Sequence, residues 1–182
     1  MIFSRRELAL GFLASTVPCV KAAGLGGLKI GVTDWNLRLT SKPEAVAVAK
    51  RLGFAGVEVS LGRKVVGDKL PLDDAELLSA YRNAFREHGL GPAGTCLDVL
   101  HVNYLKNDKL GQKWVVDGIR LTKELGARVM LLPFFGKGKL ETQTEKDYIG
   151  DVLRDIAPQA EKAGVILGLE DTISAEDNVR IV

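Results

Sequence analysis

A carboxylate closes a mostly apolar run near the end of the chain. Residues 165–169, VILGL, are typical of a buried strand, and Glu170 takes the next position. A buried charge is costly unless it is paired or bound to a metal ion. Glu170 is therefore predicted to bind a divalent cation, or else to pair with a lysine or arginine or to cap the helix that follows.

A cation held by such a carboxylate would support proton abstraction next to a carbonyl. An oxygen-rich site favours Mn²⁺ or Mg²⁺, and Co²⁺ or Zn²⁺ would fit if a histidine also contributed. Acting as a Lewis acid, the ion would polarise carbonyl and hydroxyl oxygens, acidify the neighbouring C–H bond and stabilise an enediolate. A carboxylate within hydrogen-bond reach would then take the proton.

Three other side chains are candidates for contact with a substrate, and each has an alternative structural role. Glu58 lies on the polar face of the alternating stretch 56–61, so it should point inward to a substrate or to an ion pair. His101, at the end of the third strand, could hydrogen-bond a substrate hydroxyl or remain a loop residue. Trp35 could stack on a ring of the substrate or pack in the core or at the rim.

Strand and helix patterns alternate along the chain from residue 28 onward. Strands are predicted at 28–33, 56–61, within 92–102, at 127–135 and at 165–170, and helices at 41–54, 73–90, 107–126, 144–164 and from 175. A serine cap is expected at Ser41 and an asparagine cap at Asn107, and Pro158 is expected to kink its helix. Such alternation with short joins predicts an α/β fold with a parallel sheet and right-handed crossovers.

Two architectures fit this order of elements, an open doubly wound sheet and a (β/α)₈ TIM barrel. The first strand–helix join has neither G-x-G-x-x-G nor a P-loop, which weakens the nucleotide-binding alternative. Polar residues at the ends of several strands favour the barrel; they are 33–35, Glu58, Ser60, 101–103 and Glu170. A barrel needs about 250 residues, so residues 24–182 are predicted to be the N-terminal part of one, with about the first five βα units.

The first 23 residues differ from the rest. A basic start, an apolar stretch at 8–20 and small residues after it are the layout of a cleavable export signal. The pair Arg5–Arg6 resembles a twin-arginine signal, with Leu8 in place of the usual phenylalanine. The alternative is an amphipathic first helix. Export, to the periplasm for example, is the prediction, with no membrane attachment after cleavage.

The charge gives no indication of a nucleic-acid partner, and the cysteine content excludes a disulfide within the mature chain. The chain has 182 residues, with 25 Lys and Arg against 23 Asp and Glu. Three of the basic residues and one acidic residue lie in the predicted signal, so the remainder is formally neutral and does not indicate a nucleic-acid partner. Only Cys96 would remain after cleavage, which excludes an intramolecular disulfide.

Three stretches together resemble the sugar phosphate isomerase/epimerase superfamily, whose members have the xylose isomerase-like TIM barrel. They are LGFAGVEVS (52–60), NDKLGQKWVVDGIRLTKELGARVMLLP (107–133) and EKAGVILGLEDTISAED (161–177). Their order and spacing carry the resemblance, which extends over nearly all of residues 28–182.

The resemblance to the ketose 3-epimerases of this superfamily implies roles for two glutamates. Glu170 would be a metal ligand that also moves a proton, and Glu176, six residues later, would contact the substrate. The alternative for Glu176 is a residue that only favours the dipole of its helix. The family's remaining ligands, an Asp, a His and a second catalytic Glu, would lie beyond Val182.

The resulting hypothesis is a metal-dependent carbohydrate isomerase, epimerase or related lyase. Export favours a free sugar or an oxidised glycoside over a sugar phosphate as the small-molecule partner. A non-catalytic carbohydrate-binding barrel is the alternative. The endonuclease branch that cuts at abasic sites is disfavoured, because its zinc centre needs many histidines and the chain has two. Homo-oligomer formation is left open.

Overall fold

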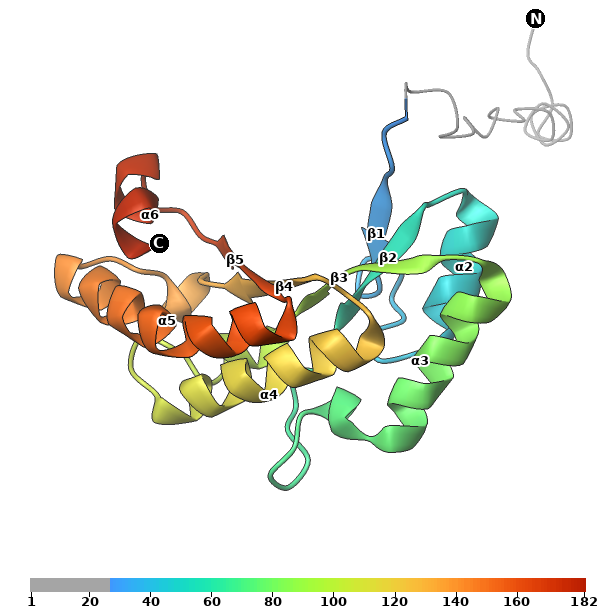
Figure 1. Cartoon of the computed structure of the whole chain (residues 1–182), viewed down its shortest axis with the longest axis horizontal. Helices are drawn as coiled ribbons and strands as arrows, with labels where there is room; N and C mark the ends of the chain where they lie inside the picture. The colour runs from blue at the N-terminus through green and yellow to red at the C-terminus, as the bar shows by residue number, and fades with distance from the viewer. Residues whose placement is uncertain (1–26) are drawn as a thin grey trace, which may run out of the picture.

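Five parallel strands in sequence order form one sheet in the computed structural model, which describes residues 27–182 (Figure 1). The predicted signal at 1–23 lies outside the described residues. The strands are β1 (Gly31–Thr33), β2 (Gly56–Ser60), β3 (Gly91–Cys96), β4 (Val129–Pro133) and β5 (Ile166–Glu170). The order β1-β2-β3-β4-β5 with every pair parallel is the order of a barrel sheet, and it excludes the doubly wound alternative.

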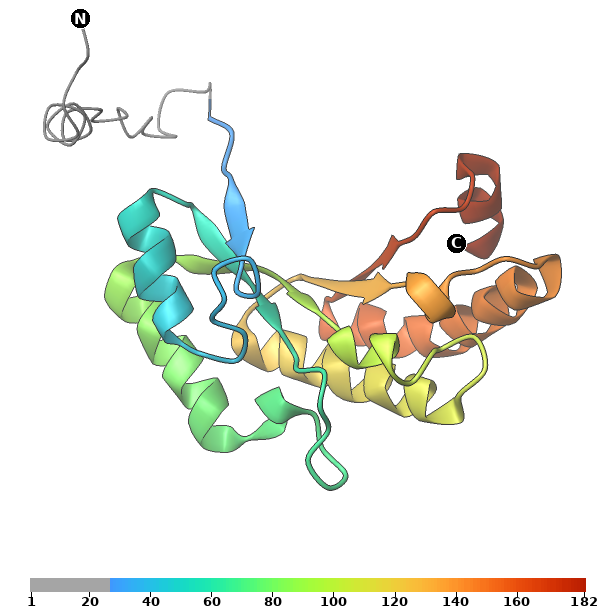
Figure 2. The same ribbon diagram turned by 180° about the vertical axis from the view of Figure 1, so that it is seen from behind.

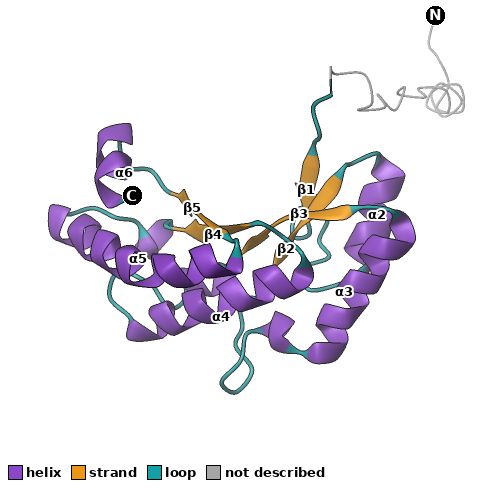
Figure 3. Ribbon diagram, viewed as in Figure 1, coloured by secondary structure: helices purple, strands orange, loops and turns teal. Residues whose placement is uncertain are grey.

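A helix follows each strand, as the alternating pattern predicted (Figure 3). The helices are α2 (Glu44–Leu52), α3 (Ala75–His88), α4 (Lys109–Leu125), α5 (Gln143–Ala163) and α6 (Ala175–Ile181), with short 3₁₀ turns η2 (Pro71–Asp73), η3 (Asp98–His101) and η4 (Gly136–Gly138). Helix α5 continues through Pro158. None of the helices in the described part of the chain has the length and apolar character needed to cross a membrane.

Three local predictions were wrong. Pro43 rather than Ser41 precedes α2, and Ser41 takes a left-handed conformation with φ of 56°. Asp108 rather than Asn107 caps α4, because its carboxylate accepts the N–H of Leu110 at 2.9 Å. His101 belongs to the 3₁₀ turn η3 after β3 and not to the strand.

Helices α2 to α5 cover one face of the sheet and the opposite face stays open, whereas α6 packs on α5 (Figures 1 and 2). Val57, Val59, Met130 and Leu132 point toward the helices and are fully buried. On the open face, Val129 is 37% exposed and Ile166 is 57% exposed. Burying a valine or leucine side chain contributes roughly 1.5–3 kcal/mol, so the layer between sheet and helices holds the fold together.

Small residues on β1, β2 and β3 leave space on the open face. A Cβ atom at Gly56 would lie 2.8 Å from the carbonyl oxygen of Gly91, so only glycine fits there. The register of β3 shifts where Gly94 rather than Ala93 pairs with Glu58. The result is a hollow of about 350 Å³, lined by Gly31, Val32, Thr33, Asn36, Glu58 and Ala93.

Candidate active site at the carboxyl ends of the strands

Glu170 ends β5 on the open side of the sheet. Leu167 and Leu169 pack against the buried core, and Glu170 alternates with them and is exposed. Gly168 shares the face of Glu170, because a Cβ atom there would meet Leu131 at 3.6 Å. The predicted orientation of this strand, with apolar residues toward the helices and the carboxylate toward the mouth, is confirmed.

Glu58 lies on the same open face, in the middle of β2, and lines the hollow described above. Burial raises the pKa of its carboxyl, and the negative charges of Glu170 and Asp98 raise it further. Glu58 therefore points inward as predicted. After burial, the charges that act on it are those of other carboxylates, and it forms no ion pair among the described residues.

Cys96 ends β3 between these carboxylates and is buried. Burial is the main reason that the pKa of its thiol is raised, and the charges of Asp98, Glu58 and Glu170 add to the effect. A thiol in such surroundings stays protonated at neutral pH and is not an activated nucleophile. Cys96 therefore contributes shape to this face, and the acidic groups around it contribute the charge.

A hydrogen-bonded pair joins the ends of β2 and β3. The hydroxyl of Ser60 donates to Oδ2 of Asp98, and it accepts the N–H of Gly62 at 3.1 Å. Ser60 is buried, whereas Asp98, the first residue of η3, is half-buried. The pair holds a carboxylate at the rim, next to Cys96 and toward Glu58.

Asp34, directly after β1, has a fully buried carboxylate. Its Oδ2 accepts the N–H of Ser60 at 3.2 Å, the N–H of Ser41 at 3.3 Å and the hydroxyl of Tyr81 at 3.1 Å. Burial raises the pKa of Asp34 to about 6, against the lowering effect of these three hydrogen bonds.

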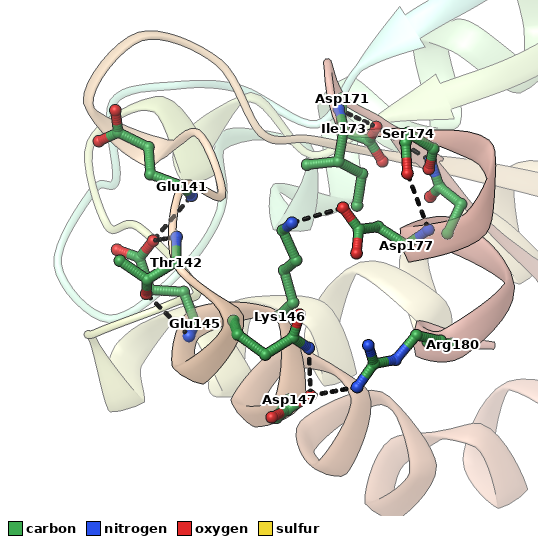
Figure 4. A network of polar contacts seen from close by, with 12 residues as sticks. Glu141, Thr142, Glu145, Lys146, Asp147, Asp171, Ile173, Ser174, Asp177 and Arg180 are labelled. Carbon is green, nitrogen blue, oxygen red and sulfur yellow. Dashed lines mark hydrogen bonds and ion pairs between the residues drawn. The ribbon is translucent and has the colours of Figure 1, made fainter.

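The segment after Glu170 is tied to the helix before β5 (Figure 4). Lys146 of α5 forms an ion pair with Asp177 of α6 at 2.5 Å. Asp171 accepts the N–H of Ile173 at 3.0 Å and the side-chain amide of Asn178 at 3.1 Å. These contacts, rather than Glu170 itself, close the turn into α6, so Glu170 is not the cap of that helix.

The remaining candidates, Glu176, Trp35 and His101, form no hydrogen bond or ion pair with Glu170 among the described residues. Glu176 is exposed in the first turn of α6, where hydrogen bonds from its own N–H and from the Ser174 hydroxyl lower its pKa. Trp35 and His101 are both half-buried, in the turn after β1 and in η3. Within residues 27–182 no hydrogen bond or ion pair joins any of the three to Glu170 or Glu58. Their substrate contacts stay predictions.

Sequence reasoning did not select Asp98, Ser60 or Asp34 as site residues. The signal was present, because Asp34 and Ser60 are polar residues at strand ends, and Asp98 comes two residues after the end of β3. A single sequence does not show that Ser60 forms a hydrogen bond with Asp98, which lies 38 positions later in the chain.

A complete metal centre is not formed by the described residues. In this part of the chain no three His, Cys, Asp or Glu side chains are arranged so that they could hold a metal ion. Glu170 has the chemistry of one oxygen ligand: it is an exposed carboxylate to which no cation is paired among residues 27–182. A full ligand set would require groups from elsewhere.

Comparison with known proteins identifies the fold. The model of a family described as "Xylose isomerase-like TIM barrel" matches residues 46–181. No curated protein sequence matches the chain. Among solved structures, D-psicose 3-epimerase from Clostridium cellulolyticum H10 with D-tagatose has a TM-score of 0.63 at 13% identity, covering 85% of this chain and 58% of that one.

Two further solved structures contain metal ions. A xylose isomerase-like TIM barrel protein from Mycobacterium smegmatis in complex with magnesium has a TM-score of 0.60 at 14% identity, covering 85% of this chain and 60% of that one. The IOLI protein with a bound zinc atom has a TM-score of 0.61 at 20% identity, covering 85% and 58%. At these identities the likeness shows the fold alone, and the chain spans about 58–60% of the length of these proteins.

Proposed function

The chain belongs to the xylose isomerase-like TIM barrel family, and from this membership we propose that it acts on a carbohydrate as a metal-dependent isomerase, epimerase or related lyase. The observation that carries the proposal is the position of Glu170. It places a carboxylate at the carboxyl end of β5, on the open face where Glu58 and Asp98 also lie. In TIM barrels this edge is where active sites are built.

Glu170 and Glu58 have complementary roles in the proposed reaction. Glu170 is exposed and serves as one ligand of a divalent cation, Mn²⁺ or Mg²⁺ by its oxygen chemistry. Glu58 lines the hollow, and its raised pKa makes it a better proton acceptor than an ordinary carboxylate. In the proposed reaction Glu58 binds a sugar hydroxyl and exchanges a proton with it.

The neighbouring structures supply the substrates with which to test the proposal. One of them was solved with D-tagatose and another in the presence of D-fructose. Proton abstraction next to a carbonyl exchanges that hydrogen with solvent, so incubation with Mn²⁺ and either ketose in D₂O should place deuterium beside the carbonyl carbon, as read by NMR. Glu170→Gln should abolish this exchange. Glu161→Gln, at an exposed glutamate on α5, is the matched control and should keep it.

The outcomes separate the alternatives. Failure of a protein that contains the complete barrel to bind Mn²⁺ and to exchange either ketose would overturn the proposal, since residues 27–182 hold only part of the ligand set. Saturable ketose binding without exchange would favour the non-catalytic carbohydrate-binding alternative.

We also propose that residues 1–23 direct export by the twin-arginine route. The support is the sequence pattern alone, with Arg5 and Arg6 ahead of an apolar stretch. A fusion of residues 1–23 to a reporter protein should reach the periplasm of a bacterium with this pathway. Replacement of both arginines by lysine should retain the reporter in the cytoplasm, and equal export of the two fusions would contradict the proposal.

A further inference from the structure

Asp34 contacts the end of β2 at two points. Its backbone N–H donates to the carbonyl oxygen of Glu58 at 3.0 Å, and its carboxylate accepts the N–H of Ser60 at 3.2 Å. The segment 58–60 is therefore held by one residue on both sides of Val59. Because Glu58 is in that segment, the direction of its side chain depends on this double contact.

The same carboxylate joins two other segments to β2. Oδ2 also accepts the N–H of Ser41, in the turn before α2, and the hydroxyl of Tyr81, on α3. Three donors from three segments thus converge on one oxygen atom. The other oxygen, Oδ1, is buried and has no hydrogen-bond partner among the described residues.

Such an arrangement is a costly way to hold a fold together. Asp34 is 0% exposed, and a buried carboxylate with one unpaired oxygen loses hydration that three hydrogen bonds do not fully replace. The three hydrogen bonds are directional, however, and their donors lie on β2, in the turn before α2 and on α3. The buried carboxylate lowers the stability of the fold but fixes the relative positions of the three segments.

The contact continues to the rim of the site. Ser60, whose N–H is bound to Asp34, donates its hydroxyl to Asp98. Asp34 is therefore linked to Glu58 through the backbone and to Asp98 through one intervening residue. Both of these carboxylates belong to the acidic group on the open face.

We propose that Asp34 is a positioning residue for the active site: it sets the direction of Glu58 and the place of the Ser60–Asp98 pair, without contacting substrate itself. The inference rests on the proposed function only in calling this edge an active site.

The charged and titratable groups around Asp34 come from each element packed on it. They are Glu58 on β2, Asp98 on η3 and Tyr81 on α3, and Glu44 of α2 acts on Tyr81. Above about pH 6 the ionised carboxylate accepts three charge-assisted hydrogen bonds. Below it a proton can occupy the unpartnered Oδ1, and the bonds to Oδ2 weaken. Protonation of Asp34 should therefore be felt at Glu58.

The test is an NMR titration of the side-chain carboxyl carbons of Glu58 and Asp98 in the full chain. In the unmodified protein each resonance should show an additional step near pH 6, which comes from Asp34. Asp34→Asn should lose that step. Tyr81→Phe keeps the carboxylate but removes a donor that favours its charged form, so the step should move to higher pH.

Asp108→Asn is the matched control. Asp108 also accepts two hydrogen bonds, from Leu110 and Asn103, but caps α4 and does not touch β2. Its replacement should leave the step near pH 6 in place. If Asp34→Asn does not fold, Tyr81→Phe alone decides the question, since an unmoved step would overturn the inference.

A purely structural role would give a different result. Asp34→Asn would then lower the unfolding midpoint while the carboxyl-carbon resonances of Glu58 and Asp98 stayed as they are in the parent at every pH, and the inference would be wrong. Deuterium exchange into D-fructose shows whether the positioning role of Asp34 is wrong or the proposed activity is wrong. If no exchange occurs in any variant but the step near pH 6 is present and Asp34-dependent, the positioning stands and the proposed activity does not.

Discussion

Lys146 and Asp177 form an ion pair between α5 and α6, with Nζ and Oδ2 2.5 Å apart (Figure 4). Their side chains are 16% and 22% exposed. The two helices flank β5, and Ile181 of α6 packs over Gly150 of α5, where a Cβ atom would lie 3.6 Å from the Ile181 carbonyl oxygen. The ion pair therefore fixes α6, and with it Glu176, relative to the strand that carries Glu170.

Replacing Lys146 by methionine should loosen α6 without unfolding the rest of the chain. Methionine keeps most of the apolar stem and removes the charge, so Asp177 is left with no cation from α5. Amide hydrogen exchange in residues 175–181 should become faster, while exchange in β2 and β3 stays unchanged. Lys162→Met, at an exposed position of the same helix, is the control. Equal protection of α6 in the two variants would contradict a holding role.

Acid should have the same effect on α6. The hydrogen bond from Lys146 lowers the pKa of Asp177, so the contribution of the pair is present above the ordinary aspartate pKa and is lost as the pH falls through the lowered value. In Lys146→Met the exchange of α6 should depend less on pH.

Thr142 and Glu145 form a capping box at the start of α5, which is the longest helix in the described part of the chain. The Thr142 hydroxyl accepts the N–H of Glu145 at 3.2 Å, and the Glu145 carboxylate accepts the N–H of Thr142 at 2.9 Å. Thr142→Ala should lower the unfolding free energy by about 1 kcal/mol, measured by urea denaturation. Thr144→Ala removes a neighbouring threonine that takes no part in the box, and a loss of the same size there would rule out the capping explanation.

Much of the barrel sheet could be predicted from the sequence, because local patterns determine it. The alternation of Val57 and Val59 with Glu58 and the run ending at Glu170 give strand positions to within one or two residues. Glycine marks helix ends for a local reason as well: α4 ends at Gly126, whose φ of 88° is unfavourable for other residues.

The contacts of the site are different, because they join residues far apart in the chain. Asp34 meets Tyr81 across 47 positions, and Lys146 meets Asp177 across 31. An aspartate after a strand has the same local pattern whether it points to solvent or is buried under a helix. The local sequence likewise predicts a helix cap at Ser41, because the hydrogen bond from its N–H to Asp34 is not visible there.

Gly118 of α4 is a position where a small residue is required by close packing. A Cβ atom there would lie 2.6 Å from the Met130 sulfur and 3.1 Å from Leu61. Gly118→Ala should therefore destabilise the chain by about 1–3 kcal/mol, as overpacking does, despite the better helix propensity of alanine. In a chain that already carries Met130→Ala, the clash with the sulfur is gone, so adding Gly118→Ala should cost less unfolding free energy than it does in the parent. Denaturation midpoints of the three variants decide this.

Asp34 should make the stability of the fold fall as the pH rises. The pKa of Asp34 is about 6 in the folded chain, against 3.8 for an ordinary aspartate. Its favourable contribution to the free energy of unfolding is therefore fully present below pH 3.8 and is lost as the pH rises through 6. The loss is on the order of 3 kcal/mol. Asp34→Asn does not titrate, so the difference in unfolding free energy between variant and parent should shift by this amount from pH 4 to pH 7. A constant difference would mean that Asp34 titrates normally.

Glu176 could contact the substrate or serve only the start of α6, and the two roles predict different results for Glu176→Gln. The carboxylate is exposed and its pKa is lowered by hydrogen bonds at the start of α6, so it already has a structural reason to be there. If it also contacts substrate, Glu176→Gln should weaken the binding of D-tagatose, followed by NMR, while the unfolding midpoint changes little. If it serves the helix alone, D-tagatose affinity should be unchanged and the amide exchange of α6 should increase. Glu141→Gln, which replaces an exposed glutamate ahead of α5, is the control for loss of surface charge. Under the proposed function we expect the first result, and because the Lys146–Asp177 ion pair already holds α6, the amide exchange of α6 should change little.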